Sequence, residues 1–235
     1  MSGDTYGHTP VDRMFAQRDV YGIGYDEGRA ARKPLRLGMV GAGGVAQSKH
    51  LPAITRLRTL WEPVVVAAVV EPDARQGKKV AELHGCRLYP DLSEMLATEE
   101  LDGVEILSPD NLHVAHALAC IEAGLPVLVE KPLAPTVREA RRLCMAADKR
   151  GVLLMSVANK RYAPPYRRAK RLIDAGVIGV PNLLSGKFNL GYEYVDLLLD
   201  GTIHLFDLVL YLIGPAASLY AVRSPAAADA FALTL

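Results

Sequence analysis

Apolar residues recur along this chain in short runs that alternate with longer amphipathic stretches, beginning at Leu35. Continuous apolar runs such as Val64 to Val70 are typical of strands buried on both faces of a parallel sheet. The stretches between these runs have helical spacing and end at glycines such as Gly85 and Gly151, which commonly terminate helices. The pattern predicts strands over 35–40, 64–70, 88–89, 104–107, 127–130 and 152–157, and helices over 45–60 (kinked at Pro52), 73–85, 91–98, 113–123 and 136–150.

Strands that alternate with helices predict a parallel sheet with crossover helices. Six strands in this order predict an α/β fold, a doubly wound Rossmann domain over residues 35–157. The pattern changes at Asn159 and predicts the opening of an α+β domain over 158–235. Its predicted elements are helices over 164–175 and 203–213 and strands over 183–189, 218–222 and 230–235.

Residues 1–34 form an N-terminal extension that keeps neither the helical nor the strand period. A short helix over 11–18 is the only element expected there. Either its aromatic residues attach the segment to the domain or to a neighbouring subunit, or the segment is partly disordered, as termini often are. The run from Gly22 to Gly28 looks like a glycine fingerprint, but no strand precedes it, so we expect no site there.

Charge and hydropathy exclude several classes of function. The chain has 235 residues, with 27 Lys plus Arg against 26 Asp plus Glu, which is a net charge of +1. This balance predicts no general attraction to nucleic acid or to an anionic membrane. The longest strand-like apolar run, 64–70, is far too short to span a bilayer, and no apolar secretory signal opens the chain.

The cysteines and most histidines show no pattern that indicates chemistry. Cys86, Cys120 and Cys144 are widely spaced, which suits a reducing cytoplasm and small core or surface residues. We interpret His116 as an ordinary helix residue. No metal site is expected, because the remaining histidines lack metal-ligand spacing: His8, His50 and His84.

A glycine-rich turn lies between the first predicted strand and the first predicted helix. Glycines at 41 and 43 permit a tight turn and a close approach of the backbone to a pyrophosphate, and alanine at 46 allows close helix–strand packing. The helix N-terminus supplies N–H groups for phosphate oxygens. The alternative is a turn that serves packing alone. The candidate phosphate-binding residues of this turn are Gly41, Gly43, Gly44, Val45 and Ala46.

Glu71 stands at the end of the second predicted strand, where an acid can accept hydrogen bonds from ribose hydroxyls. It lies 30 residues after Gly41, a longer spacing than the usual one of about 20. A carboxylate there repels a 2′-phosphate and favours NAD over NADP, although nearby Arg75 softens that preference.

The strand 127–130 ends in the charged pair Glu130-Lys131, followed by Pro132. Doubly wound folds bind their ligands at this edge of the sheet. A lysine there can donate to a substrate oxygen and serve as acid or base. Pro132 raises the chance of a cis peptide bond. The alternative is a surface lysine that simply ends a strand.

Polar residues form one stripe along the apolar helix predicted near the C-terminus. Asp200, His204, Asp207 and Tyr211 are spaced by four, three and four residues. A polar stripe on a buried helix must meet a polar group, water or a ligand. Asp200 can therefore set the tautomer and basicity of His204. The alternative is a satisfied buried network without chemistry, to which Asp207 and Tyr211 would belong first.

These motifs together resemble the Gfo/Idh/MocA family of NAD(P)-dependent oxidoreductases, which includes glucose–fructose oxidoreductase and inositol dehydrogenase. The resemblance covers residues 35–223. Its specificity rests on Glu130-Lys131-Pro132 followed by the Asp-x-x-x-His spacing of Asp200 and His204. Other matching stretches are 35–46, 108–113, 124–132, 159–162 and 176–179.

The resemblance implies a second domain with a mainly antiparallel sheet, and roles for matching residues. Lys131 and His204 would be the catalytic acid/base pair, with Asp200 orienting or tuning them. Arg161 and Tyr162 would lie near the substrate. NAD, with NADP as the alternative, would be bound by Gly41, Gly43, Gly44, Val45, Ala46, Glu71, Ser108, Pro109, His113, Glu130 and Lys131.

The chain departs from the family pattern in three places, the mildest of which is Asp110, where the family often has asparagine. The family usually has glycines just before the Asp-x-x-x-His motif, where this chain has Tyr192 and Tyr194. That segment should face the substrate, so the usual substrates are in doubt. The chain ends at Leu235, short of the usual family length, so either it is truncated or a partner completes the open sheet edge.

We therefore expect a cytoplasmic, homo-oligomeric dehydrogenase or reductase that moves a hydride between a nicotinamide cofactor and a hydroxyl-bearing carbon. The expected substrate is a sugar, a cyclitol or a sugar conjugate. One alternative is a lyase or glycosidase that recycles its cofactor, which net cofactor consumption would distinguish. A second alternative is a non-enzymatic nucleotide-binding sensor or subunit, against which the presence of Lys131, Asp200 and His204 argues.

Overall fold

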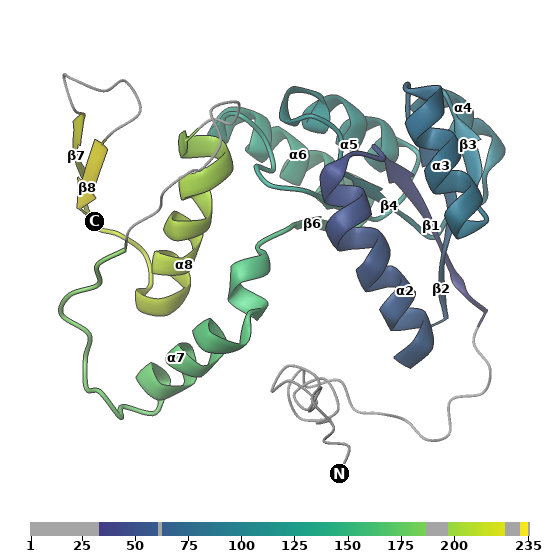
Figure 1. Ribbon diagram of the computed structural model, residues 1–235. Helices are drawn as coiled ribbons and strands as arrows, with labels where there is room; N and C mark the ends of the chain where they lie inside the picture. Colours follow the sequence, from purple (N-terminus) through teal and green to yellow (C-terminus); the bar gives the residue numbers. More distant parts are fainter. Residues whose placement is uncertain (1–32, 61–62, 187–196, 224–230, 235) are drawn as a thin grey trace, which may run out of the picture. The chain divides into compact units, whose positions relative to one another are not determined.

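The computed structural model describes residues 33–60, 63–186, 197–223 and 231–234 (Figure 1). The described residues from Pro34 onward belong to one unit. The expected N-terminal helix and the glycine run at 22–28 lie outside the described residues, as do Tyr192 and Tyr194.

A parallel sheet of six strands organises this unit. All of its neighbouring strands are parallel, and its order is the one typical of dinucleotide-binding folds. The sequence prediction of a doubly wound α/β fold is confirmed. In sheet order the strands are β3 (Arg87–Tyr89), β2 (Val64–Val70), β1 (Leu35–Val40), β4 (Gly103–Ile106), β5 (Val127–Val129) and β6 (Leu154–Ser156).

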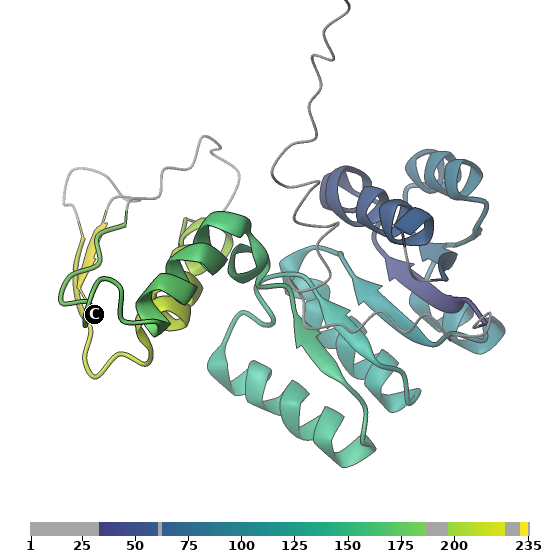
Figure 2. The same ribbon diagram turned by 90° about the horizontal axis from the view of Figure 1, so that it is seen from below.

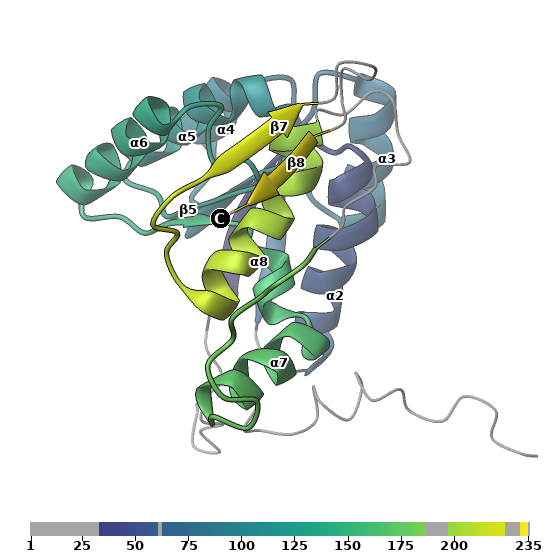
Figure 3. The ribbon, with the colours of Figure 1, turned by 90° about the vertical axis from the view of Figure 1, so that its left-hand side faces the viewer.

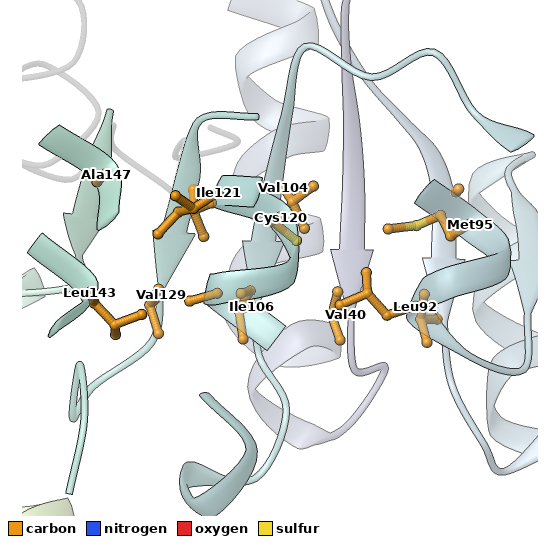
Figure 4. Close-up of a cluster of buried hydrophobic side chains, with 14 of the residues drawn as sticks. Val40, Leu92, Met95, Val104, Ile106, Cys120, Ile121, Val129, Leu143 and Ala147 are labelled. Carbon is orange, nitrogen blue, oxygen red and sulfur yellow. The ribbon is translucent and has the colours of Figure 1, made fainter. Parts of the chain in front are cut away.

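Helices cover both faces of this sheet, as Figure 2 shows for α2 in dark blue and α6 in teal. Successive residues of a strand point to opposite faces, so Met39 and Val40 belong to two different core clusters. One face packs on α2 (Leu51–Leu60) and α3 (Ala74–His84). The other face packs on α4 (Leu92–Thr98), α5 (His113–Glu122) and α6 (Val137–Arg150). Val40, Ile106, Val129 and Leu143 belong to the buried hydrophobic cluster on this face (Figure 4).

Local capping residues account for the helix boundaries. The side chain of Asp73 accepts hydrogen bonds from the N–H groups of Arg75 and Gln76, and this satisfies amides that the first turn of α3 leaves unpaired. Thr136 accepts from the N–H of Glu139 at the start of α6, as the predicted capping box requires. Both helices end within one residue of the predicted boundaries.

The predicted kink at Pro52 takes the form of a π-helical turn, η2 (Ala46–His50), that leads directly into α2. The N–H of Leu51 binds the carbonyl of Ala46, five residues earlier. Pro52 has no N–H to continue the ordinary helical bonding, so the backbone widens by one residue before it. This wide turn places His50 at the end of the glycine-rich segment.

The residues after β6 form a second group of elements. These are η4 (Asn159–Tyr162), α7 (Pro164–Asp174), η5 (Leu197–Thr202) and α8 (Ile203–Ile213), followed by β7 (Tyr220–Arg223) and β8 (Phe231–Thr234), which pair antiparallel (Figure 3). The predicted strand over 183–189 is wrong for its described residues 183–186, which have no regular structure. Leu183 is 82% exposed, and none of the described strands runs alongside it to complete a ladder.

The described residues include no helix that is both long and apolar enough to cross a membrane. All three cysteines are free thiols, with Cys120 buried, Cys86 half-buried and Cys144 exposed. Burial raises the pKa of Cys120 to about 12, which makes it an inert core residue as the sequence suggested.

Candidate active site at the carboxyl edge of the sheet

The loops that carry the sequence motifs meet at one edge of the sheet because their strands are parallel. The N–H of Gly41 binds the last carbonyl of β2 at 2.8 Å, and the N–H of Leu107 binds the last carbonyl of β1 at 2.8 Å. The N–H of Glu130 binds the last carbonyl of β4 at 2.9 Å. Backbone hydrogen bonds therefore hold together the starts of three of the four loops that carry candidate residues.

The glycine-rich loop has the form that a pyrophosphate needs. Gly41 has φ +101°, and a Cβ there would lie 2.7 Å from the carbonyl oxygen of Leu107, so only glycine fits. A Cβ at Gly43 or Gly44 would meet no atom within 4 Å, which leaves open space above the loop. The backbone is helical from Gly44, and Ala46 is 1% exposed, packed in the core as predicted. The loop fits a phosphate-binding role at a helix N-terminus.

Glu71 follows β2 and its carboxylate is fixed by three donors. Oε2 accepts from the N–H of Ala42 at 2.8 Å and from Nε2 of Gln76 at 3.1 Å. Oε1 accepts from the N–H of Asp73 at 3.0 Å. The acid is therefore held beside the glycine-rich loop, where the resemblance places the adenosine ribose. Gln76 was not predicted; its place one turn into the following helix was the available signal.

The loop after β4 is tied to the turn after β5 by His113. Nδ1 of this side chain lies 2.7 Å from the carbonyl oxygen of Pro132, and Nε2 lies 2.8 Å from that of Ser108. His113 is 1% exposed, so the two loops of the candidate site are joined through a buried side chain.

His116 also belongs to this loop. Its Nδ1 lies 2.9 Å from Oγ of Ser108, and burial together with the nearby His113 lowers its pKa. His116 lies within α5, as its interpretation as a helix residue requires, and the turn of helix between it and His113 brings both rings onto the Ser108 loop. Pro109 continues that loop into the short helix η3 (Asp110–Leu112).

The Glu130-Lys131-Pro132 segment forms a tight turn with a cis Lys131–Pro132 bond, as the proline suggested. Oε2 of Glu130 accepts from the N–H of Lys131 at 2.8 Å, and Oε1 lies 3.0 Å from Nε2 of His50. Burial alone would raise the pKa of Glu130, but the His50 and Lys131 contacts outweigh it and lower the pKa. Glu130 is therefore a carboxylate at neutral pH.

His50 is the contact that the sequence did not predict. It lies 80 positions before Glu130, and its spacing to other histidines carried no information. One signal was available: Glu105 interrupts an otherwise apolar strand, and a buried carboxylate requires a partner. The structure gives that partner as His50, whose Nδ1 lies 3.1 Å from Oε2 of Glu105.

His204 lies in the first turn of α8 and is half-buried. Burial and the positive charges of Lys131 and Lys160 lower its pKa, against a smaller opposing effect of Glu130 and Asp207. The imidazole is thus neutral at neutral pH and able to accept a proton. Asp200 lies in η5, immediately before α8, and its side chain is outside the described residues.

The rest of the polar stripe on α8 is satisfied by Arg161. Its guanidinium binds the carboxylate of Asp207 and lies 5.6 Å from the centre of the Tyr211 ring. These contacts are of the kind that the alternative of a polar network without chemistry predicts for Asp207 and Tyr211. The neighbouring Tyr162 is 56% exposed. Among the described residues, no three His, Cys, Asp or Glu side chains gather in a way that would hold a metal ion.

A family model described as the oxidoreductase family with an NAD-binding Rossmann fold matches residues 35–158. The chain belongs to this oxidoreductase family. The matched range is the six-stranded sheet with its helices, and it ends one residue beyond the predicted Rossmann domain. The resemblance stated from the sequence motifs is therefore confirmed.

Among the curated members of this family, inositol 2-dehydrogenase 4 of Saccharopolyspora erythraea is 30% identical over 202 residues. The match covers 83% of this chain and 59% of the relative, so the chain spans about three fifths of that relative's length.

Two solved structures of this kind carry bound nucleotides. GenD2 from gentamicin A biosynthesis, in complex with NAD, is 27% identical with a TM-score of 0.74, covering 87% of this chain and 61% of that chain. KijD10, a 3-ketoreductase from Actinomadura kijaniata in complex with NADP and TDP-benzene, is 29% identical with a TM-score of 0.56. That match covers 62% of this chain and 43% of the other. The two relatives thus differ in cofactor.

Proposed function

We propose that this chain carries the cofactor site and the start of the substrate site of an NAD-dependent oxidoreductase that acts on a hydroxyl-bearing carbon. The substrate class is a sugar, a cyclitol or a sugar conjugate, in line with the inositol dehydrogenase and the 3-ketoreductase among the relatives. One observation carries the proposal: Glu71 accepts from the N–H of Ala42 at 2.8 Å, at the sheet edge where the loops with Ser108 and with Glu130-Lys131 also begin. In agreement with the predicted acid/base pair, burial and the charge of Lys131, which lies 73 positions earlier, lower the pKa of His204.

The cofactor assignment rests on the fit of the glycine-rich loop and of Glu71. Gly43 and Gly44 leave space for a pyrophosphate, and the Glu71 carboxylate is held ready for ribose hydroxyls. A fixed carboxylate repels a 2′-phosphate, so NAD is favoured over NADP. Ser108, Pro109 and Glu130 would line the nicotinamide side, with His113 supporting their loops.

The acid/base chemistry follows from the state of each group. When bound, the nicotinamide supplies a hydride acceptor for the carbon that bears the hydroxyl. His204, neutral at pH 7, takes the hydroxyl proton, and the Lys131 ammonium donates a hydrogen bond to the same oxygen. Asp200, one turn before His204, would orient the imidazole. In the reducing direction His204 returns the proton to the carbonyl oxygen.

On the substrate side we assign Tyr162, Tyr192 and Tyr194 to contacts with hydroxyl groups, because tyrosine combines an apolar ring with a polar tip. Arg161 would also contact the substrate, through the part of its guanidinium that the ion pair with Asp207 leaves exposed. Its side chain is 40% exposed, which leaves room for a second acceptor.

We also infer a homo-oligomer and a location in the cytoplasm. Subunit contacts are what the family resemblance implies for the second group of elements. Three free thiols without a disulfide suit a reducing compartment. Light scattering of the purified chain tests the first inference: a mass of one chain at micromolar concentration would contradict it.

The first experiment is a titration with NADH and NADPH, followed by energy transfer from the aromatic residues to the reduced nicotinamide. We expect saturable binding that is tighter for NADH, and a loss of this preference in Glu71→Gln. Glu82→Gln, on the exposed side of α3, is the matched control and should bind as the parent chain does. A folded chain that binds neither nucleotide would contradict the proposal.

The second experiment screens myo-inositol, other cyclitols and sugars for NAD-dependent oxidation. His204→Asn and Lys131→Met should each lower turnover by orders of magnitude while NADH binding survives. Net formation of NADH separates this activity from a lyase or glycosidase that recycles its cofactor. Turnover without net NADH would favour the latter.

A further inference from the structure

Three ionisable side chains from separate parts of the sequence meet beneath the carboxyl edge of the sheet. His50 ends η2, Glu105 lies on β4 and Glu130 follows β5. Nδ1 of His50 lies 3.1 Å from Oε2 of Glu105, and Nε2 lies 3.0 Å from Oε1 of Glu130. Their side chains are only 11%, 11% and 13% exposed, respectively, so water screens these contacts little.

The hydrogen bonding of this cluster determines its protonation. An ionised carboxylate can only accept a hydrogen bond, whereas a neutral imidazole has a single N–H. Both contacts of His50 are therefore satisfied only when the ring is an imidazolium that donates from both nitrogens. Burial lowers the pKa of His50, but the hydrogen bonds and charges of Glu105 and Glu130 outweigh burial and raise it to about 9.

The cluster also decides how Glu130 is oriented. One oxygen of its carboxylate faces His50, and the other accepts from the N–H of Lys131 at 2.8 Å. The carboxylate is thus held on both sides, by the turn after β5 and by the end of the glycine-rich segment. Without a cation at position 50 that donates to Glu105 and Glu130 at once, one of these two anchors is weakened and the Glu130 side chain is freer to rotate.

Glu105 has no assigned role in the chemistry of the site, yet it is buried on β4, one of the two central strands of the sheet. A carboxylate in that position costs free energy unless it is paired and hydrogen-bonded. Its presence is explained if it holds the imidazolium that in turn holds Glu130. The charged groups acting on His50 are these two carboxylates, and Lys131 acts on Glu130 from its other side.

We propose that His50 is a positioning residue of the cofactor site: as a cation anchored by Glu105, it holds the Glu130 carboxylate in the orientation that binds the nicotinamide ribose. The role of Glu130 rests on the proposed function; the His50–Glu105 anchor does not. The proposal links the glycine-rich segment, which faces the phosphates, to the Glu-Lys-Pro turn, which faces the reactive half of the cofactor.

The proposal separates the two halves of the cofactor in a binding experiment. ADP contains the adenosine and the phosphates but lacks the nicotinamide ribose, so its affinity should not depend on His50. We expect His50→Gln to weaken NADH binding at least tenfold and to leave ADP binding unchanged. His84→Gln, at the end of α3, is the matched control and should bind both ligands as the parent chain does.

A pH series distinguishes positioning from simple structural support. In the parent chain NADH binding should persist up to about pH 9 and weaken above it, because the imidazolium is lost there. Glu105→Gln keeps the shape of the side chain but removes its charge, so the loss should move to lower pH. If His50 had a purely structural role, His50→Gln would weaken NADH binding by the same factor at every pH.

Histidine ring resonances in the parent chain give a readout that needs no cofactor. We expect one ring, absent in His50→Gln, to titrate near pH 9, and to titrate at lower pH in Glu105→Gln. A His50 ring that is neutral at pH 7 would overturn the proposal, as would unchanged NADH affinity in folded His50→Gln. If that variant does not fold, Glu105→Gln and the ring titration decide.

These results remain separable from the proposed function. A parent chain that does not bind NADH would contradict the NAD assignment, whatever the titration of His50 shows. A parent chain that binds NADH tightly, with a Glu105→Gln variant whose pH dependence is unchanged, would leave the NAD assignment intact and overturn the role of His50.

Discussion

Arg161 and Asp207, 46 positions apart, form a forked ion pair that joins η4 to α8. Nε of Arg161 lies 2.9 and 2.8 Å from the two oxygens of the Asp207 carboxylate, and Nη2 donates to the same group. These bonds raise the pKa of Arg161. The pair supplies the polar partner that Asp207 requires on an otherwise apolar helix, three residues after His204.

Asp207→Asn should lower the free energy of unfolding by about 1–2 kcal/mol, because it removes the charge from a bidentate contact. Solvent limits the effect, since the Arg161 side chain is 40% exposed. The matched control is Lys170→Met, which breaks a surface pair with Asp174 on α7 and should cost less than about 0.5 kcal/mol. Denaturant titration measures both; equal effects would show that the Arg161 pair is merely a surface contact.

Alanine at Gly41 should mainly lower the stability of the fold, whereas alanine at Gly43 should mainly weaken cofactor binding. Gly41→Ala places a Cβ 2.7 Å from a backbone oxygen at φ +101° and should destabilise the fold by more than about 2 kcal/mol. Gly43→Ala meets no protein atom and should cost less than about 1 kcal/mol, but its methyl group would occupy the space assigned to the pyrophosphate. We expect weaker NADH binding from a stably folded Gly43→Ala; unchanged affinity would place the phosphates elsewhere.

Stability should fall between about pH 6.5 and pH 9 because of His50. Its pKa in the folded protein is about 9, against 6.5 for the ordinary side chain, so the folded state holds the proton more tightly. This contribution is fully present below pH 6.5 and is lost as the pH rises through 9, with a magnitude on the order of 3 kcal/mol. The measurement is the difference between the stability profiles of the parent chain and His50→Gln. A difference that does not change with pH would contradict a buried imidazolium.

The titration of His204 should depend on the charge of Lys131. Burial and the nearby lysines lower its pKa, so we expect its ring to titrate below pH 6.5. Lys131→Met removes one of those charges and should move the titration to higher pH. Lys149→Met, in the last turn of α6, is the control and should leave it in place. Ring resonances followed against pH give the result, and no shift in Lys131→Met would separate the two groups of the proposed acid/base pair.

The secondary structure of the Rossmann domain could be predicted from the sequence because the patterns that determine it involve residues close together in the chain. The runs at 35–40 and 64–70 became β1 and β2 with the predicted bounds, and Asp73 and Gly85 cap α3 as their chemistry requires. The strand predicted over 183–189 was wrong for its described residues 183–186 for the converse reason. Residue types favour or disfavour a strand, but a strand also needs a neighbouring strand, which a local stretch of sequence does not specify.

Only part of the candidate site could be predicted from the sequence. Motifs that are contiguous, such as the glycine-rich loop and Glu130-Lys131-Pro132, could be placed at the sheet edge from the βαβ order alone. The partner of Glu130 could not, because His50 lies 80 positions earlier in a segment without a motif of its own. The same holds for Gln76 beside Glu71 and for the ring of His116 beside Ser108.

The sequence by itself determined the order of strands and helices, the glycine turn and the polar stripe on α8, since periodicity and capping depend on residues a few positions apart. Only the tertiary structure decided which charges meet. The parallel pairing brings β4 and β5 side by side, and the π-helical turn before Pro52 places His50 next to Glu105 on β4 and Glu130 directly after β5. Contacts of this kind depend on the packing of whole elements, which no short stretch of sequence contains.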